Sequence, residues 1–338
     1  MPRVDLGPRG SRRAAPGPRP ALTSPPTAAT KPAVEKGKSI WMNGKLVAWD
    51  DARVHVLTHT LHYGVGAFEG IRCYECVDGR SAVFRLREHI VRLVQSCVVL
   101  GIESPYGVDE LVEACLDTVR ANDLKACYIR PLVYVADGEM GLGSVTVNPI
   151  HVSIAAWPWG SYLGDEGLAN GIRVRTSSYQ RMHVNTLMTK AKAVGHYVNS
   201  IMASIEAKRG GYDEALMLDV DGYAAEGCGE NLFIVRDGRV KTPPIATVLE
   251  GITRASAIEL LRADGVTVTE ERFTRDEIYI ADEAFMTGTA AEITPLRSLD
   301  DRTIGAGKPG PVTKRLQQTY FEAIRGGRPE YRRWLAYL

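Results

Sequence analysis

The sequence predicts a two-domain protein of mixed α/β composition, with the α+β arrangement in its first half. Three observations lead to this prediction. The 338 residues suffice for two domains of ordinary size. Hairpin signals alternate with segments of helical periodicity along the chain. A stretch rich in glycine and polar residues, 159–171, is the best candidate linker. We expect a small N-terminal domain over 38–158, a larger C-terminal domain over 172–338, and a cleft between them.

The elements expected in the N-terminal half begin near Ser39. SIWMNGKLVAW (39–49) is typical of two short strands joined at Asn43-Gly44, and a similar Asp-Gly turn precedes the strand SAVF (81–84). Apolar residues at helical spacing predict a helix over 86–100 that stops at Gly101. A second helix is expected to follow with Asp109 as its N-cap. The segments ACYIRPLVYVA and HVSIAAW are predicted strands.

The C-terminal half shows the same alternation. GIRVRTSSY (171–179) predicts a strand, and Val198, Ile201, Met202 and Ile205 stand at helical spacing in a helix that ends at Gly210-Gly211. Asp-Gly pairs at 221–222 and 237–238 predict hairpins. ITRASAIELLRADG is a predicted helix with a glycine stop, TRDE (274–277) fits a capping box, and EAFMTGTAAEI predicts a strand that breaks at a Gly-Thr turn.

Composition and charge exclude several classes of function. The formal net charge of +1 gives no global field that would favour nucleic acid or an anionic membrane. No run of about 18 apolar residues occurs, so no membrane-spanning segment is expected. Six cysteines in a chain of this length do not make a disulfide framework, which favours a reducing, cytoplasmic location.

The first 37 residues are expected to form a disordered tail. The first 36 hold eight of the eighteen prolines and few large apolar side chains, so they cannot bury enough surface to offset the entropy of ordering. Their arginines and scarce acids resemble a transit peptide, but a dispensable tail or an upstream start codon is the favoured interpretation.

Two lysines in TKAKAVGHY (189–197) are candidates for chemistry. Residues two apart do not share a helix face, so at most one of Lys190 and Lys192 points into a cleft. Both could be solvated surface lysines. The small neighbours also suit a buried amine, which loses charge and can form a Schiff base with a carbonyl. The spacing alone leaves the choice open.

Four further segments carry polar groups in unusual surroundings. In AAEGCGENLFIV (224–235), Glu226 is either part of an ion pair or a functional acid able to protonate a pyridine nitrogen, whereas Glu230 fits a simple turn acid. LEGITR places free N–H groups at a helix start, and MTGTAAEI exposes donors at a turn; both are weak anion-site signals. Arg130, inside the strand YIRP, needs an anionic substrate group or a structural acid as partner.

The histidines of HVLTHTLHYGVGAFEGIR (55–72) suggest a metal site, but no neighbouring ligands complete one. We therefore expect no metal. The stretch 63–70 is better interpreted as a glycine-rich loop whose aromatic residues wall an apolar pocket. CYEC (73–76) is a lone Cys-x-x-Cys and carries little weight.

Together these segments supply a lysine for a Schiff base, an acid for a pyridine nitrogen and two anion sites, the set that a pyridoxal phosphate enzyme requires. The order of WMNGKLVAWDDARVHVLTHTLHYGVGAFEGIR, YIRPLVYV, AKAVGHYVNS, EGCGENLF, LEGITR, FMTGTAAEITP and GPVTKRLQ resembles the bacterial branched-chain amino acid aminotransferases. The resemblance covers about residues 38–320. It implies a two-domain, fold-type IV architecture like that of D-amino-acid aminotransferase, with the cofactor in the interdomain cleft.

The resemblance implies roles for individual residues. Lys192 carries the cofactor, Glu226 faces the pyridine nitrogen, and Tyr197 lies near the phenolic oxygen. The phosphate and ring would be held by Arg92, Leu249, Ile252, Thr253 and Thr289. The substrate pocket would comprise Tyr63, Phe68, Gly70, Tyr128, Arg130, Met140, Leu142, Trp159, Tyr162 and Ala290. Tyr63 and the loop with Met140 and Leu142 would reach across from a second subunit, which implies a homodimer or a higher assembly.

The activity implied by the resemblance is transamination of leucine, isoleucine and valine with 2-oxoglutarate, in biosynthesis and degradation of these amino acids. His196 and Cys228 depart from the family pattern without replacing a required proton or charge. Three alternatives stay open: a D-amino-acid or (R)-amine transaminase, an aminodeoxychorismate lyase, and a non-catalytic cofactor-binding protein. YIRP and the aromatic pocket argue against the first, and the presence of both Lys192 and Glu226 argues against the last.

Overall fold

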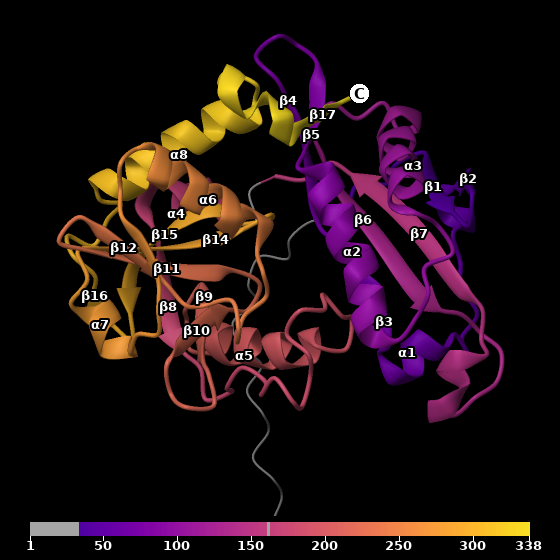
Figure 1. Ribbon diagram of the computed structural model, residues 1–338, viewed down its shortest axis with the longest axis horizontal. Helices are drawn as coiled ribbons and strands as arrows, with labels where there is room; N and C mark the ends of the chain where they lie inside the picture. The colour runs from indigo at the N-terminus through magenta and orange to yellow at the C-terminus, as the bar shows by residue number, and fades with distance from the viewer. Residues whose placement is uncertain (1–33, 161–162) are drawn as a thin grey trace, which may run out of the picture. The chain divides into compact units, whose positions relative to one another are not determined.

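The computed structural model describes residues 34–160 and 163–338, which contain two β-sheets with helices packed on them (Figure 1). The predicted tail therefore lies almost entirely outside the described residues. Val34–Lys38 is the short part of its vicinity that is described, and it contains no helix or strand.

The first sheet is antiparallel throughout and is built mainly from the N-terminal half. Its order is β17-β5-β4-β6-β7-β1-β2, with β3 also on β6. The strands are β1 (Ser39–Met42), β2 (Lys45–Ala48), β3 (Gly66–Phe68), β4 (Ile71–Glu75), β5 (Ser81–Phe84), β6 (Cys127–Val135), β7 (Ile150–Trp157) and β17 (Leu335–Tyr337). The helices are α1 (His59–Tyr63), α2 (Leu86–Leu100) and α3 (Val108–Ala121), with short 3-10 turns at Trp49–Asp51 and Leu142–Thr146.

The second sheet mixes parallel and antiparallel pairs. Its order is β10-β9-β8-β15-β14-β11-β12-β13, with β16 on β15, and the β8–β9, β8–β15 and β12–β13 pairs are parallel. The strands are β8 (Ile172–Thr176), β9 (Glu214–Leu218), β10 (Ala224–Gly227), β11 (Asn231–Arg236), β12 (Arg239–Thr242), β13 (Val268–Glu270), β14 (Glu283–Gly288), β15 (Glu292–Leu299) and β16 (Arg302–Thr303). The helices are α4 (Gly164–Asn170), α5 (Tyr197–Arg209), α6 (Ile252–Ala263), α7 (Arg275–Tyr279) and α8 (Pro311–Ile324).

Two large apolar clusters hold these elements together. In the first, the inner faces of α2 and α3, including Ile90 and Leu111, pack against one face of the N-terminal sheet. The second contains Phe84 of β5, Phe233 of β11 and Tyr320 of α8, so it joins residues of both sheets. Burial of apolar surface in the second cluster fixes the two halves of the site against each other.

The local predictions are largely confirmed. Both predicted strands around Asn43-Gly44 form, α2 ends at Gly101 in the left-handed conformation, and Thr274 and Glu277 make the predicted capping box. The predicted N-cap Asp109 is wrong. α3 begins at Val108 after Gly107, because the Glu110 carboxylate accepts the Gly107 N–H at 2.7 Å.

Three segments differ from the expected outline. The predicted linker contains α4, which packs on β15 of the second sheet, and the predicted loop at 63–70 contains the end of α1 and strand β3. The chain also returns at its end to the N-terminal sheet, because β17 pairs with β5 after the 3-10 turn Pro329–Trp334. The domain boundaries at 158 and 172 stay predictions.

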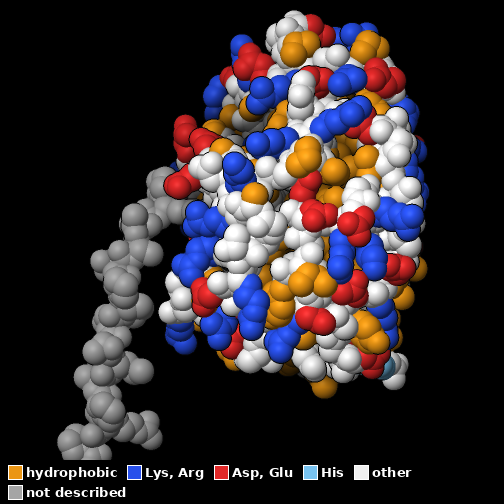
Figure 2. All heavy atoms as spheres, turned by 90° about the vertical axis from the view of Figure 1, so that its left-hand side faces the viewer, with side chains coloured by type: hydrophobic (Ala, Val, Ile, Leu, Met, Phe, Trp, Pro, Cys, Tyr) orange, Lys and Arg blue, Asp and Glu red, His pale blue; other side chains and the backbone are white. Residues whose placement is uncertain are grey.

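The surface that carries α7, β12 and β16 is covered by interspersed basic and acidic side chains (Figure 2). This matches the formal net charge of +1 and gives that face no field of one sign. Among the described helices, none combines the length and the apolar character needed to cross a bilayer.

One helix turns its apolar face outward. The apolar spacing predicted α5 correctly, but Val198, Ile201, Met202 and Ile205 on that face are all exposed in the chain. The inward face carries Ser200, Ala203 and Ala207 instead, which pack beside β9. Apolar faces that stay exposed mark surfaces for interaction.

Candidate active site

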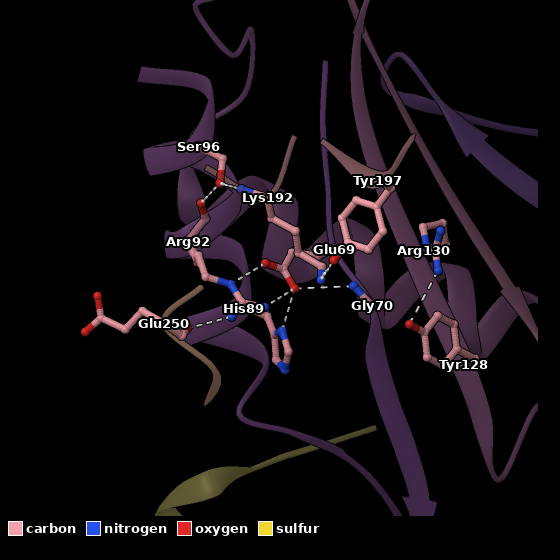
Figure 3. Close-up of polar contacts among 10 residues, drawn as sticks. All are labelled: Glu69, Gly70, His89, Arg92, Ser96, Tyr128, Arg130, Lys192, Tyr197 and Glu250. Atoms are coloured by element: carbon pink, nitrogen blue, oxygen red, sulfur yellow. Dashed lines mark hydrogen bonds and ion pairs between the residues drawn. The ribbon is translucent and has the colours of Figure 1, made fainter. Parts of the chain in front are cut away.

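Lys192 lies at the centre of a pocket between the two sheets, in an irregular segment before α5. Its backbone N–H donates to Ser96 Oγ at 3.0 Å, and its carbonyl accepts the Phe68 N–H at 3.1 Å. Its Nζ donates to the Tyr197 hydroxyl at 2.7 Å (Figure 3). These bonds tie the segment to α2 and β3 and hold the amine inside the pocket.

Lys190 points elsewhere. Its Nζ donates to the Ile245 carbonyl and lies 3.9 Å from the Glu250 carboxylate, and its side chain is 42% exposed. Glu250 belongs to the segment that leads into α6. The two lysines that the sequence left undistinguished are therefore separated by the structure into one surface ion pair and one amine in a pocket.

Glu226 occupies the opposite wall of the same pocket, on β10. It is buried and forms an ion pair with Arg181, which is buried as well. The second carboxylate oxygen accepts the Leu249 N–H at 3.2 Å and the Asn231 side-chain amide at 3.3 Å. Burial raises the pKa of Glu226, while Arg181 and the Leu249 N–H act in the opposite direction.

Arg92 is held on α2 by a fully buried acid, Glu69. The Arg92 guanidinium donates to both Glu69 oxygens, from Nε at 2.7 Å and from Nη2 at 2.9 Å, and Nη1 donates to the Glu250 carbonyl at 2.8 Å (Figure 3). His89 Nδ1 lies 2.7 Å from the same carboxylate. Burial alone would raise the pKa of Glu69, but Arg92 and His89 outweigh it and hold that pKa well below its usual range.

The end of the pocket near Arg92 is formed by the start of α6. Gly251 is the N-cap, and Ile252 and Thr253 occupy the first turn, where backbone N–H groups have no partner within the helix. Thr287, Gly288 and Thr289 close the same end from β14 and the turn after it. Unpaired N–H groups beside a guanidinium attract an anion such as a phosphate.

A second compartment opens from the first past Lys192. It is lined by Phe68 and Gly70 from the β3–β4 connection, Tyr128 and Arg130 from β6, Trp159, and the turn residue Ala290. The two compartments share Lys192, Tyr197, Gly229, Glu230 and Thr289, so they are parts of one cleft.

Arg130 is positioned by aromatic rings and has no acidic partner among the described residues. Its guanidinium carbon lies 4.7 Å from the centre of the Phe68 ring, and Nη2 donates a long hydrogen bond of 3.4 Å to the Tyr128 hydroxyl. Nε is buried without a partner in the part of the chain that the structure describes. Of the two partners that the sequence left open for Arg130, the structural acid is therefore not found in residues 34–160 and 163–338.

The structure brings most of the predicted site residues together in this cleft. The first compartment holds Arg92, Lys192, Tyr197, Glu226, Leu249, Ile252, Thr253 and Thr289, and the second holds Phe68, Gly70, Tyr128, Arg130, Trp159 and Ala290. Tyr63, Met140 and Leu142 do not line it; they are exposed on the surface of the chain. Tyr162 lies outside the described residues.

Several residues of the cleft were missed by sequence reasoning. Glu69 and Arg181 are partners of predicted residues and come from segments distant in sequence. The spacing of His89 and Arg92, one helical turn apart, could have indicated a shared partner. Glu230 is not the simple turn acid expected, because it is buried in the wall shared by both compartments, and burial together with Glu214 raises its pKa to about 8.

The predicted departures and the histidine-rich segment have local partners. His196 is buried beside the pocket, and burial lowers its pKa. His59 Nε2 lies 2.9 Å from the Gly141 carbonyl, and His62 Nε2 lies 2.9 Å from the Val56 carbonyl. Within the described ranges, no group of three or more potential ligands is placed to hold a metal ion.

The first compartment fits pyridoxal phosphate by the chemistry of its groups. An amine, a buried carboxylate, and an anion site formed by Arg92 and the α6 N-terminus match the aldehyde, the pyridine nitrogen and the phosphate. Thr287 Oγ1 is buried at the pocket wall and has no hydrogen-bond partner among the described residues, so the wall offers a further polar atom to a ligand.

Comparison with known proteins gives a consistent result. The family model for amino-transferase class IV matches residues 66–299. The branched-chain-amino-acid aminotransferase of Pseudomonas aeruginosa is 52% identical over 295 residues, covering 87% of this chain and 95% of that protein.

Two solved structures of a branched-chain amino acid aminotransferase, both from the source abbreviated T.th., are also similar. One is complexed with N-(5'-phosphopyridoxyl)-L-glutamate (48% identity, TM-score 0.86) and the other with 4-methylvaleric acid (47% identity, TM-score 0.85). In both cases the alignment covers 89% of this chain and 99% of the solved one.

Proposed function

Because this chain belongs to the class IV aminotransferases, we propose that it uses pyridoxal phosphate to transfer the amino group of leucine, isoleucine or valine to 2-oxoglutarate. The products are the branched-chain 2-oxo acids and glutamate. The observation that carries this proposal is the placement of the Lys192 amine and the buried Glu226 carboxylate on the walls of one pocket whose end is an anion site.

The roles of the residues follow from their places in the pocket. When bound, pyridoxal phosphate supplies an aldehyde that condenses with amines and a ring that takes up the electrons released at the substrate Cα. Arg92, the N–H groups of Ile252 and Thr253, and Thr289 bind the phosphate, and Leu249 packs against the ring. Glu226 keeps a proton on the ring nitrogen. Arg181 supports this role, since it opposes the effect of burial on the Glu226 carboxyl.

Lys192 moves the proton of the reaction. Nζ accepts the proton from the substrate Cα and delivers it to the carbon that takes the amino group. The hydrogen bond with the Tyr197 hydroxyl, 2.7 Å long, directs the amine toward the centre of the cleft. Tyr197 also packs edge-on against Phe68, with ring centres 4.9 Å apart, which limits the movement of both rings.

The second compartment must accept an aliphatic side chain in one half-reaction and a carboxylate in the other. Phe68 and Trp159 offer apolar walls, and Arg130 with the Tyr128 hydroxyl offers a cationic and a polar group. The lack of an acidic partner for Arg130 among the described residues supports its assignment to the side-chain carboxylate of 2-oxoglutarate and glutamate. The α-carboxylate meets the backbone of Thr289 and Ala290.

A homodimer is part of the proposal. Tyr63, Met140 and Leu142 lie outside the cleft of their own chain and are exposed, and α5 presents its apolar face to solvent. A second copy that covers these surfaces would bury the apolar side chains and bring the three residues to its cleft. The six free cysteines suit a reducing compartment, and we propose the cytoplasm.

The test is a panel of amino donors with 2-oxoglutarate, with glutamate formation as the readout. We expect leucine, isoleucine and valine to be the fastest donors. Preference for D-amino acids or (R)-amines would assign the chain to another activity within the family. Release of pyruvate from an aminodeoxychorismate substrate without any 2-oxo acid acceptor would instead identify a lyase.

A further inference from the structure

Glu292 occupies a backbone conformation that its side chain does not favour. Its φ is +55°, in the left-handed region. The non-glycine residues with positive φ in the described chain are Asn43, Arg85, Asp123, Asp237, Glu292, Asp300 and Asp301. Asn and Asp tolerate this region, whereas longer side chains enter it at a cost and persist there only where the surroundings impose it.

The position explains why the conformation is needed. Gly288 and Glu292 are cross-strand partners, so residues 289–291 form a three-residue connection between β14 and β15. Connections of this length commonly end with a left-handed residue, and glycine is the usual choice there. This chain places a glutamate where the turn favours glycine, which indicates that the side chain has a role.

The Glu292 side chain reaches back to the other sheet. It is buried, and Oε1 accepts the Tyr74 hydroxyl at 2.9 Å and lies 3.9 Å from Arg72 Nη1. Tyr74 and Arg72 both belong to β4 of the N-terminal sheet. Burial raises the pKa of the Glu292 carboxyl, and Arg72 acts against that effect.

Arg72 connects the same network to another wall of the substrate compartment. Its Nη1 donates to the Gly160 carbonyl at 3.4 Å, next to Trp159. The turn at 289–291, the β4 strand and the segment bearing Trp159 thus meet at one cluster of polar groups. Such a cluster constrains the relative positions of the elements that contribute to it.

We propose that Glu292 is a positioning residue that holds the Thr289–Ala290 turn in the shape that binds the substrate α-carboxylate. This rests on the proposed function, which assigns that turn to the carboxylate. Glu292 acts through the backbone: its side chain is anchored by Tyr74 and Arg72, and the anchored residue keeps the end of the turn in the left-handed conformation. Without the anchor the turn relaxes and the donors of Thr289 and Ala290 lose their alignment.

The experiment measures the affinity of the cofactor-loaded protein for 4-methylvaleric acid, a carboxylate with the carbon skeleton of leucine and no amine. Binding is followed through the visible absorbance of the cofactor. Glu292→Ala should weaken the acid about tenfold, the effect of losing a strong buried hydrogen bond. Glu292→Gly accepts the backbone conformation but lacks the anchor, and it should bind as weakly as Glu292→Ala. Glu292→Gln keeps an acceptor for Tyr74 and should restore most of the affinity.

Kinetics separate positioning from general damage. The Ala and Gly variants should raise the KM for leucine with a much smaller change in kcat, because the carboxylate contact is what they weaken. The matched control is Glu283→Gln on β14. Glu283 is also buried and accepts the N–H groups of Val312 and Thr313, at 3.0 and 2.8 Å, far from the turn in the strand register. It should lower the melting temperature and leave the acid affinity unchanged.

The outcomes distinguish this inference from the proposed function. If the unmodified protein retains no cofactor or does not bind 4-methylvaleric acid, the proposed function fails. If it binds the acid and Glu292→Gly binds it equally well, the side chain has no positioning role and the inference is overturned. Equal losses in the Glu283→Gln control would also overturn it, since they would assign the effect to lowered stability.

Discussion

At the scale of single residues, the Arg181–Glu226 ion pair decides the charge of the group that faces the proposed ring nitrogen. Both side chains are buried, and burial by itself favours the protonated form of the carboxyl. Arg181 shifts the balance back toward the carboxylate. A protonated Glu226 could not hold a proton on the ring nitrogen, so Arg181 should matter for turnover although it transfers no proton itself.

We expect Arg181→Met to lower kcat at neutral pH and to lower the free energy of unfolding by about 3–5 kcal/mol, the usual effect of leaving a buried charge unpaired. Because the variant raises the pKa of Glu226 further, kcat should recover as the pH increases, and the acidic limb of the kcat profile should move to higher pH. Arg181→Lys keeps the charge and serves as the control. A profile of Arg181→Met that coincides with that of the unmodified protein would contradict this role.

Glu230 makes a pH prediction of its own. Its pKa in the folded chain is about 8, above the ordinary value of 4.5, because of burial and of Glu214. The folded state therefore binds a proton that the unfolded state releases. The stability that this proton contributes is present in full below about pH 4.5 and is lost as the pH rises to about 8.

Glu230→Gln removes that titration. The free energy of unfolding of the unmodified protein should fall relative to the variant between about pH 5 and 8, by at most about 1.4 kcal/mol per pH unit. Unfolding midpoints measured for both proteins across this range provide the test. Parallel curves would mean that Glu230 is ionised in the folded chain.

At the scale of elements, α5 combines a helix that the sequence predicts with a face that it does not. The apolar spacing of Val198, Ile201, Met202 and Ile205 identifies a helix, and in most helices that stripe faces the core of the same chain. Here small residues such as Ala203 face inward. The periodicity cannot tell whether an apolar face is covered by the same chain or by another one.

We expect Ile201→Glu to convert the proposed homodimer to monomers, because it places a charge in the centre of the exposed apolar face, where Ile201 is 54% exposed. Sedimentation velocity measures the change. Glu206 lies on the polar part of α5 and accepts hydrogen bonds from Ser177 and Ser178, so a variant of the exposed Lys208 on the same helix is the better control. A monomeric unmodified protein, or a dimer that persists in Ile201→Glu, would exclude this face as the interface.

At the scale of the whole molecule, the sequence predicts what is local and misses what is brought together over long distances. The Asn43-Gly44 hairpin, the helix over 86–100 and the capping box at Thr274 are specified within a few residues, and the structure contains them. The return of β17 to β5 depends on apolar packing between residues from opposite ends of the chain, including Phe84 and Trp334. No local pattern encodes such a pairing.

The site follows the same division. Lys192 and Glu226 could be proposed from their surroundings because each stands among small residues that permit close packing. Glu69 and Arg181 could not, because their importance comes from partners in distant segments. The strain at Glu292 is also invisible in the sequence, since a glutamate carries no sign of a left-handed φ.

The central claim is that the amine of Lys192, and not that of Lys190, carries the cofactor. The direct measurement is reduction of the purified protein with borohydride, followed by proteolysis and mass spectrometry of the peptide that contains residues 189–197. We expect one phosphopyridoxyl group, located on Lys192, and its complete loss in Lys192→Ala but not in Lys190→Ala. A group found on Lys190 or on another side chain, or no group at all, would contradict the account.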